Sequence, residues 1–434
     1  MTPSTLGDWL AYLEQLHPSA IDMGLDRSRK VAQQLGLTRP APRVITVTGT
    51  NGKGSTCAFV AALLQAQGLK VGVYSSPHLL RYNERVKVQG VEATDLELCD
   101  AFVAVEAARG DVTLTYFEMG TLAAFWLFEQ ARLDAVVLEV GLGGRLDAVN
   151  LIDADISLVT SIGIDHADWL GDTRESVAFE KAGIFRAGRP AICGDLDPPE
   201  PLLAKARELK CPLLLRGRDF DLCVNQQDWD WRGFAHGEVI ELHGLPLLDL
   251  PMQNAALALQ AYALLGYPLQ HEVISEALAS TRLAGRLDRR TVHWHGRSIN
   301  LLLDVGHNPH AAQFLAQRMA QQPIVGERLA VFGLLSDKDL EGVVCELASS
   351  IQDWAVAPLP TSRSRPAAEL HAALENLGVR VKSYSSIALA LEAQCAHATP
   401  DDEILLFGSF YCVSEALEWL ARHTDEEAAN GFAG

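Results

Sequence analysis

The sequence lacks the features of a secreted or membrane-spanning protein. None of its apolar runs reaches the roughly 18 residues needed to cross a bilayer, and its N-terminus has no basic segment followed by an apolar one. Its 8 cysteines form no CxxC pair, so we interpret them as reduced and mostly buried side chains. These absences predict a cytoplasmic protein without a membrane partner.

An excess of positive charge is also missing. The formal net charge of −19 argues against nucleic acid as a partner, because phosphate backbones are bound by basic surfaces. It does not exclude small anionic ligands, because charges more than roughly 8 Å away are screened at physiological salt. Nothing in the sequence demands more than a monomer.

The composition and the hydrophobic pattern indicate two α/β domains. The chain has 434 residues, of which 48% are hydrophobic and 21% charged, and this length is too great for one ordinary core. Short apolar runs such as "RVITVTG", "KVGVYSS", "LDAVVLEVG" and "DISLVTSIG" alternate with helix-like segments, which predicts a parallel sheet covered on both faces. The same alternation restarts at "INLLLDVGHNP", so we expect a second, Rossmann-like α/β domain.

A stretch of different character separates the two alternating parts. Residues 218–250 are rich in Trp and Gly and alternate in polarity, so we expect antiparallel hairpins there, followed by helices near 251–265 and 271–280. The predicted boundaries are therefore an N-terminal domain at 1–285, a connection at 286–297, a C-terminal domain at 298–423 and a frayed acidic tail at 424–434.

A glycine-rich turn with an embedded lysine follows the first strand. In "ITVTGTNGKGST", residues 45–56, an apolar run leads through this turn into a helix-like segment. Such a turn exposes backbone N–H groups and a helix N-terminus to one spot, where a lysine adds a point charge, so it can bind the phosphates of ATP. The alternative is a tight turn with a solvated lysine. The loop residues are Gly49, Thr50, Asn51, Gly52, Lys53, Gly54 and Ser55.

This loop departs twice from the usual phosphate-binding pattern. Val47 stands in place of the first glycine, and Gly54 stands in place of the Ser or Thr that normally holds magnesium. Ser76 and Glu139 lie at the ends of the predicted second and third strands and offer hard oxygen ligands to the same crevice. Taken singly they could be a turn residue and an ion-pair partner, although a buried carboxylate still requires some cation.

Six ordered motifs together resemble the folylpolyglutamate synthase/dihydrofolate synthase branch of the Mur ligase superfamily. They are "TGTNGKGS", "SSPHLLRYNERV", "LEVGLGGRLDAVN", "IGIDHADWLG", "FEKAGIF" and "LDVGHNPHA", and the resemblance extends from residue 21 to residue 411. It implies a P-loop-containing, Mur-ligase-like ATPase domain with a parallel sheet and a small antiparallel section, followed by the Rossmann-like domain. The implied activity is ATP-dependent addition of L-glutamate to 7,8-dihydropteroate, and of further glutamates to tetrahydrofolate, through an acyl phosphate.

The resemblance also assigns a metal and catalytic set. Ser76 and Glu139 would bind one Mg²⁺ ion and His166 a second, while Lys181 would carry a carbamate that acts as a ligand. Without the resemblance, His166 would be interpreted as structural and Lys181 as a solvated helix lysine. Carbamylation requires a neutral amine, hence a setting that lowers the lysine pKa. The implied catalytic residues are Lys53, His166, Lys181, Asp304 and His307.

The remaining implied contacts concern the three substrates. ATP would also meet Asn254, Arg286 and Asp304, and the incoming glutamate would meet His307 and Ser409. The pterin would stack on Phe117 and bond to Asp22 and Asp147; without the family match these would be interpreted as a core aromatic and surface acids. The implied pterin contacts are Asp22, Met23, Gly24, Leu25, Thr115, Tyr116, Phe117, Glu118, Leu146, Asp147 and Ala148.

Two other functions remain open at this stage. One is a monofunctional folylpolyglutamate synthase, which would not accept dihydropteroate. The other is a nucleotide-binding regulatory protein that kept the fold and lost the ligase chemistry, although the presence of Lys53, Glu139, His166 and Lys181 argues against it.

Overall fold

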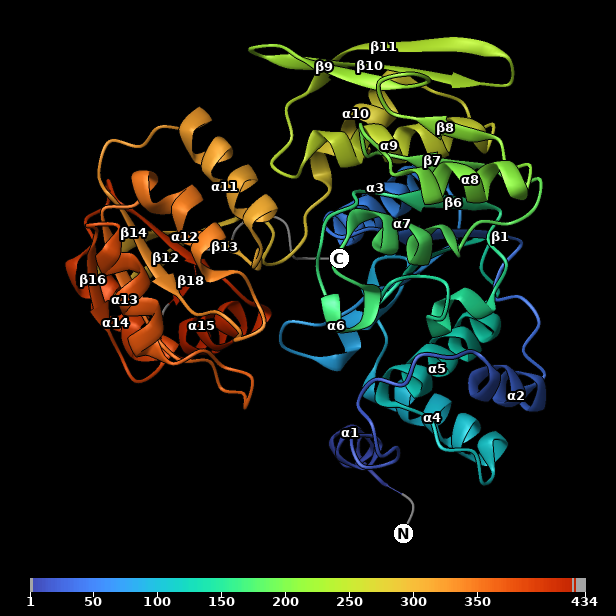
Figure 1. Ribbon diagram of the computed structural model, residues 1–434, viewed down its shortest axis with the longest axis horizontal. Helices are drawn as coiled ribbons and strands as arrows, with labels where there is room; N and C mark the ends of the chain where they lie inside the picture. The colour runs from blue at the N-terminus through green and yellow to red at the C-terminus, as the bar shows by residue number, and fades with distance from the viewer. Residues whose placement is uncertain (1–2, 424, 427–434) are drawn as a thin grey trace. The chain divides into compact units, whose positions relative to one another are not determined.

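The computed structural model describes residues 3–423 and 425–426. The chain forms two compact units, Met1–Thr281 and Arg282–Gly434, which we describe separately as the first and second unit. Figure 1 shows the elements of both. Within the described residues, no helix has the length and apolar character needed to cross a membrane.

The first unit is built on an eight-stranded sheet in the order β4-β3-β2-β5-β1-β6-β7-β8. Six of these strands, from β2 to β8 in that order, run parallel, while β3 and β4 are antiparallel. Strands β1 and β5 are almost wholly buried, as expected of a parallel sheet that is covered on both faces. The strand bounds are β1 Arg43–Thr48, β2 Val71–Tyr74, β3 Val86–Val88, β4 Val91–Glu92, β5 Ala135–Glu139, β6 Ile156–Val159, β7 Ala191–Cys193 and β8 Leu213–Leu215.

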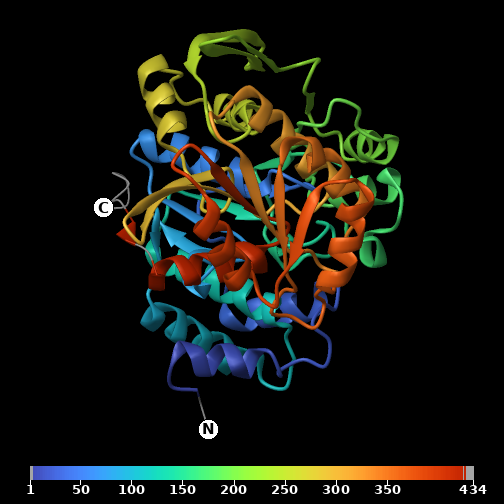
Figure 2. The same cartoon turned by 90° about the vertical axis from the view of Figure 1, so that its left-hand side faces the viewer.

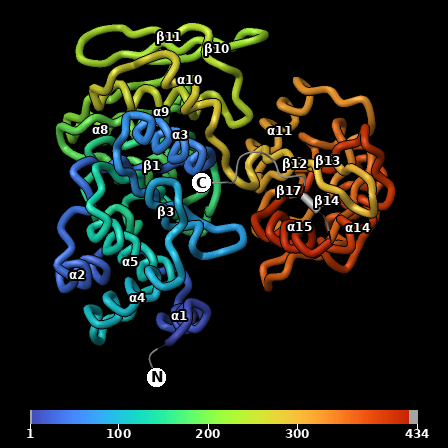
Figure 3. Tube along the Cα trace, turned by 180° about the vertical axis from the view of Figure 1, so that it is seen from behind, coloured from blue at the N-terminus to red at the C-terminus, as the bar shows by residue number. Residues whose placement is uncertain are grey.

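Helices pack against this sheet and against each other. α3 contacts β1, β2 and β5 on one side and α9 and α10 on another, so most of its circumference is apolar and buried. α1, α2, α4 and α5 form a second group, which Figure 3 shows from behind. The bounds are α1 Leu6–Leu13, α2 Asp26–Leu35, α3 Lys53–Ala66, α4 Asp95–Arg109, α5 Tyr116–Ala131, α6 Ala167–Leu170, α7 Arg174–Ala182, α8 Glu200–Glu208, α9 Met252–Leu264, α10 His271–Ser280, and the 3₁₀ turns η1 Tyr82–Arg85 and η2 Ala148–Leu151.

The expected antiparallel section is confirmed as a three-stranded sheet, β9 Asp221–Val224, β10 Asp228–Ala235 and β11 Glu238–Pro246. It lies along α9 and α10 (Figure 1). The Trp231 indole N–H donates to the Ala256 carbonyl of α9 at 3.1 Å. The buried Gln260 amide of the same helix bonds to both the N–H and the carbonyl of Phe234. These bonds satisfy polar groups that packing would otherwise leave without partners.

The second unit has the expected Rossmann-like arrangement. Its seven-stranded sheet has the order β16-β15-β14-β17-β13-β12-β18; the five strands from β16 to β13 are parallel, and β12 and β18 are antiparallel. Figure 2 shows its helices on both sides of the sheet. The bounds are β12 Asp288–Trp294, β13 Arg297–Asp304, β14 Arg328–Phe332, β15 Asp353–Val356, β16 Arg380–Ser383, β17 Glu403–Phe407, β18 Asp425–Glu426, α11 Pro309–Gln321, α12 Leu340–Leu347, α13 Ala367–Asn376, α14 Ile387–His397, α15 Phe410–His423 and the turn η3 Ala348–Ser350.

Two stretches at the predicted domain limits have a structure of their own. Residues 286–297, predicted to be a connection, contain β12, and this strand pairs with β13 along its whole length. In the tail expected to be frayed from Thr424, residues 425–426 form β18 beside β12. Thr424 and residues 427–434 lie outside the described residues.

Candidate functional site

The glycine-rich loop joins β1 to α3, and Lys53 is the first residue of the helix. The Lys53 ammonium donates to the carbonyls of Gly49 at 2.9 Å and Thr50 at 3.4 Å, so the side chain folds back over the loop. The first N–H groups of a helix have no partner within the helix, and the helix dipole is positive at this end. The strand, the glycine turn and the helix start therefore lie in the predicted order, with the Lys53 ammonium over the turn.

Two glycines of the loop have no room for a side chain. A Cβ on Gly49 would lie 1.7 Å from the Thr160 hydroxyl oxygen. Gly52 has a φ of +85°, and a Cβ there would lie 2.6 Å from the Asn254 amide nitrogen. The loop therefore packs closely against the segment after β6 and against helix α9, and only glycine leaves room for these backbone contacts.

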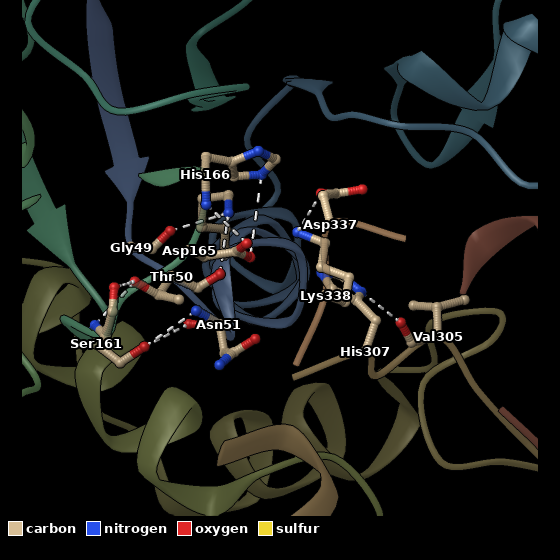
Figure 4. A network of polar contacts seen from close by, with 12 residues as sticks. Gly49, Thr50, Asn51, Ser161, Asp165, His166, Val305, His307, Asp337 and Lys338 are labelled. Carbon is tan, nitrogen blue, oxygen red and sulfur yellow. Dashed lines mark hydrogen bonds and ion pairs between the residues drawn. The ribbon is translucent and has the colours of Figure 1, made fainter. Parts of the chain in front are cut away.

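The N–H groups of Thr50 and Asn51 have partners within the protein. Thr50 N–H donates to the Ser161 carbonyl at 2.9 Å, and Asn51 N–H donates to the Ser161 hydroxyl at 3.0 Å. The Thr50 hydroxyl donates to the Gly163 carbonyl and accepts from its N–H, and the Thr160 hydroxyl donates to the Asn51 carbonyl. Figure 4 shows Ser161 facing this part of the loop. Thr50 and Asn51 thus shape the loop through Ser161.

Ser55 occupies the position one residue after the usual magnesium-binding hydroxyl, and it is buried. Its hydroxyl donates to the Gly52 carbonyl at 3.1 Å and accepts from the Asn254 side-chain amide at 2.8 Å. Asn254 belongs to α9, so this bond ties the start of α3 to that helix. In this structure Ser55 and Asn254 hold the shape of the loop.

Ser76 and Glu139 are brought together as expected. Glu139 ends β5 and pairs in register with Val47 of β1, and its side chain accepts a hydrogen bond of 3.3 Å from the Ser76 N–H. Glu139 is only 5% exposed. Burial raises the pKa of the nearby Cys57 thiol; the charge of Glu139 raises it further and that of Lys53 lowers it. A carboxylate, a hydroxyl residue and the phosphate-loop lysine therefore share one edge of the sheet.

These donors fit a magnesium ion that shares its coordination with phosphate. Within residues 3–423 and 425–426, no group of three or more His, Cys, Asp or Glu side chains could hold a metal ion unaided. Magnesium does not need such a group, because it commonly takes one or two carboxylates and completes its shell with phosphate oxygens and water. The buried Glu139 at the end of β5 supplies this kind of ligand.

The predicted metal residues His166 and Lys181 both lie near Asp165. His166 precedes α6 in a left-handed conformation with a φ of +54°, and its N–H donates to Asp165 Oδ1 at 2.8 Å. Lys181, near the end of α7, is 3% exposed. Burial lowers the pKa of its ammonium to about 7; the nearby charge of Lys53 lowers it further, and Asp165 opposes this shift. Near pH 7 this lysine has a large neutral fraction.

The predicted pterin residues occupy two neighbouring clusters. In the first, the Arg27 guanidinium bonds to the carboxylates of Asp22 at 2.7 Å and Glu118 at 3.1 Å, and His17 Nε2 lies 3.1 Å from Asp22. Glu118 also accepts hydrogen bonds from the Ser28 hydroxyl and from the backbone N–H of Thr115, the residue that caps α5. Because its carboxylate has these internal partners, Glu118 supports the cluster from within the protein. Gly24 and Leu25 lead from it into α2.

The second cluster surrounds Gly141. A Cβ on this glycine would meet the Phe117 ring at 2.7 Å and the Asp147 carboxylate at 3.3 Å, so both side chains lie against its backbone. Asp147 accepts from the N–H groups of Leu142 at 2.8 Å and Val149 at 2.9 Å. Burial raises the pKa of Asp147 to about 6, although these bonds and the charge of Lys53 lower it.

The other pterin candidates lie around these clusters. The Met23 methyl lies near Gly143, against which the side chain of Leu170 also packs. The Arg85 guanidinium lies 5.5 Å from the centre of the Tyr116 ring. Leu146 and Ala148 flank Asp147 at the start of η2.

In the second unit, Asp304 is the last residue of β13, and Ser409 follows the adjacent parallel strand β17. Asp304 accepts from the N–H groups of Leu287 at 2.9 Å and Gly306 at 2.7 Å. Burial raises its pKa, and the charge of Arg286 opposes this. His307 Nδ1 lies 2.9 Å from the Val305 carbonyl (Figure 4), and the Arg286 guanidinium lies over the Phe410 ring.

The residues that hold the others in place are not among those predicted from the sequence. Ser161 and Thr160 bond to the phosphate loop, Asp165 acts on Lys181, and Arg27 and His17 hold Asp22. The only sequence feature that could have identified some of them is their position along the chain. Thr160, Ser161 and Asp165 follow a predicted strand whose end faces the same crevice as the phosphate loop.

Comparisons with known proteins cover most of the chain. A model of the Mur ligase middle domain matches residues 47–215, and a model of the Mur ligase glutamate ligase domain matches residues 285–410. The dihydrofolate synthase/folylpolyglutamate synthase of Escherichia coli (strain K12) is 48% identical over 415 residues, which make up 96% of this chain and 95% of that protein.

Solved structures give the same result. Escherichia coli FolC in complex with DHPP and ADP matches with a TM-score of 0.90 and 46% identity, over 97% of this chain and 99% of that one. A bifunctional folylpolyglutamate synthase/dihydrofolate synthase with Mn, AMPPNP and L-glutamate bound matches with a TM-score of 0.88 and 44% identity, over 97% of this chain and 100% of that one.

The contact between Gly52 and Asn254 can be tested with Gly52→Ala. We expect weaker ATP binding and a lower free energy of unfolding, because the new Cβ meets the Asn254 amide and the backbone conformation disfavours a side chain. Gly68→Ala is the control: its φ of +76° carries similar strain, of roughly 1–2 kcal/mol, but nothing lies within 4 Å of the added Cβ. Equal effects of the two changes on ATP binding, measured by calorimetry, would contradict the proposed contact.

Proposed function

This chain belongs to the dihydrofolate synthase/folylpolyglutamate synthase family of Mur ligases, and we propose which of its residues perform the reaction. It is an ATP-dependent ligase that joins L-glutamate to the carboxylate of a pteroate or folate, and it uses a divalent metal ion. We further propose that the acceptors are 7,8-dihydropteroate and tetrahydrofolate, and that the metal is magnesium.

The observation that carries the assignment of residues is the position of Lys53. Its charge acts on Asp147 among the proposed pterin residues, on Lys181 among the proposed metal residues, and on Cys57, where Glu139 also acts. Electrostatic influence of this kind falls off within several ångströms in a partly buried site. The groups proposed to bind the acceptor, the metal and the phosphates are therefore neighbours.

Condensation requires activation, because a carboxylate does not react with an amine in water. In the proposed first step, a carboxylate oxygen of the acceptor attacks the γ-phosphorus of ATP, the bond to the β-phosphate oxygen breaks, and ADP leaves. The Lys53 ammonium and the N–H groups at the start of α3 stabilise the charge that spreads over the transferring group. An acyl phosphate of the acceptor results.

In the second step, the amine nitrogen of L-glutamate, once deprotonated, attacks the carbonyl carbon of the acyl phosphate. The carbon–oxygen bond to phosphate breaks, inorganic phosphate leaves, and the nitrogen loses its remaining extra proton to give the amide. We propose that His307 and Ser409 bind the incoming glutamate, and that Asn254, Arg286 and Asp304 contribute to the binding of ATP. No covalent bond between enzyme and substrate is needed.

We propose that Ser76 and Glu139 hold one magnesium ion and His166 a second. When bound, magnesium neutralises phosphate charge and orients the γ-phosphate for attack. Lys181 fits the carbamate role chemically: its neutral amine can add to carbon dioxide, releasing one proton and leaving a carbamate anion. The lowered pKa of Lys181, caused first by burial, makes that neutral amine available near pH 7.

The Asp147 carboxyl, which accepts backbone N–H bonds, and the Phe117 ring lie where a pterin could stack and bond. Acceptance of dihydropteroate separates a bifunctional enzyme from a monofunctional folylpolyglutamate synthase. We also propose a cytoplasmic monomer, in keeping with 8 cysteines that are all free; light scattering tests the oligomeric state.

Purified protein with ATP, Mg²⁺, L-glutamate and either 7,8-dihydropteroate or tetrahydrofolate tests the function. We expect glutamate-dependent phosphate release with both acceptors, and a product that mass spectrometry shows to be heavier by one glutamyl group. Turnover with tetrahydrofolate alone would indicate the monofunctional enzyme. ATP binding without any glutamate-dependent turnover would instead support a regulatory protein.

Lys53→Ala should lower kcat by roughly a hundredfold or more, the usual loss when one electrostatic stabiliser is removed. Lys70→Ala is a matched control, because Lys70 also donates to a backbone carbonyl, that of Ala131, but is exposed and lies outside the loop. Steady-state phosphate release measures both variants. A near-normal kcat for Lys53→Ala would contradict the assigned role.

Lys181→Ala should abolish most of the activity while circular dichroism shows an intact fold. Lys181→Arg is the decisive companion, because arginine keeps the positive charge but stays protonated and cannot form a carbamate. If the carbamate is needed, both variants lose at least roughly a hundredfold in kcat. An active Lys181→Arg enzyme would show that only the charge matters.

A further inference from the structure

The segment from Thr160 to His166 follows β6 and meets two parts of the proposed site. At its start, Thr160, Ser161 and Gly163 form the hydrogen bonds that shape the phosphate loop at Thr50 and Asn51. At its end it carries Asp165 and His166. The position of this segment therefore affects both the phosphate loop and the proposed metal residues.

The middle of the segment is held by an ion pair that touches none of the residues assigned to substrates. The Ile162 N–H donates to Asp195 Oδ2 at 2.8 Å, and the Ile162 carbonyl accepts from Arg174 Nε at 3.0 Å. Arg174 and Asp195 bond to each other at 3.0 Å, which closes the ring. Both backbone polar groups of one residue are thus fixed by one charged pair.

The pair itself is fixed to the sheet and to a helix. Asp195 follows β7, and its Oδ1 also accepts from the Asp197 N–H at 3.0 Å, while Arg174 donates to the Asp197 carbonyl at 2.9 Å. The preceding Gly194 approaches so closely that a Cβ there would lie 2.8 Å from the Thr160 carbonyl oxygen. Arg174 is the first residue of α7, the helix that carries Lys181.

We infer that Arg174 and Asp195 are positioning residues for nucleotide binding, acting through Ile162 and Ser161 on the phosphate loop. The inference rests on the proposed role of that loop. Charge-assisted bonds to both backbone polar groups of one residue restrict a loop more than neutral bonds do. Without them the Ser161 hydroxyl and carbonyl lose their fixed place, and the N–H groups of Thr50 and Asn51 lose their partners.

The experiment compares wild type, Asp195→Ala, Arg174→Ala and the double variant. The dissociation constant of AMPPNP in the presence of Mg²⁺ is measured by calorimetry, and KM for ATP and for dihydropteroate by phosphate release. We expect both nucleotide constants to rise about tenfold in each single variant, with less than about a twofold change in KM for dihydropteroate. Because the two residues act as one unit, the double variant should be no worse than either single one.

Conservative variants guard against loss of folding. Asp195→Asn keeps an acceptor for the Ile162 N–H and weakens the ion pair, so its nucleotide constants should lie between those of wild type and Asp195→Ala. Arg109→Ala is the matched control: Arg109 pairs with Glu106 at 2.6 Å and bonds to the carbonyls of Gly110 and Val112 at the end of α4. It should lower thermal stability without changing nucleotide affinity.

Unchanged AMPPNP affinity in folded Asp195→Ala and Asp195→Asn would overturn the inference. Equal increases in KM for ATP and for dihydropteroate, also seen in Arg109→Ala, would overturn it as well, because they would reflect general destabilisation. A wild-type protein that binds AMPPNP but does not ligate glutamate would refute the proposed function, while the affinity measurements would still decide the role of the pair.

Discussion

The structure of the site depends on one constraint, the placement of the Lys53 charge among groups that are themselves mostly buried. Lys53 is held over the loop by the carbonyls of Gly49 and Thr50, and its charge acts on both Asp147 and Lys181. Burial disfavours charge on each of these two groups, so Lys53 helps to keep the acid ionised and the second amine neutral. Burial has the larger effect on both groups, and the one lysine adds to it at Lys181 and opposes it at Asp147.

The order of strands explains why these groups meet. Because β5 lies between β2 and β1, and β6 lies on the other side of β1, the ends of four parallel strands bring Ser76, Glu139, the phosphate loop and the Thr160–His166 segment to one edge. Residues more than 100 positions apart, such as Asn51 and Ser161, become hydrogen-bond partners there. The sheet thus creates a site that no short stretch of sequence contains.

The fold class was predictable because apolar strands, glycine turns and helices alternate along the whole chain. The pairing of Ser76 with Glu139 was also predictable, since both follow strands of one parallel sheet. The internal roles of Ser55 and Glu118 were not, because they depend on Asn254 and Arg27, whose contacts arise only in the folded chain. A sequence motif indicates which residues lie close together. The tertiary contacts determine which of their polar atoms have hydrogen-bond partners within the protein.

That distinction divides the loop motif into two parts. In "GTNGKGS", the N–H groups of Thr50 and Asn51 donate hydrogen bonds to Ser161. This half of the motif therefore fixes the conformation of the loop. The other half begins at Gly52, where the chain turns left-handed and enters α3, and the first N–H groups of a helix point away from its body. A side-chain hydroxyl directly after Lys53 is therefore not needed to build the cradle. Gly54 stands at that position, and the metal-binding oxygens can come from neighbouring strands, where Glu139 lies.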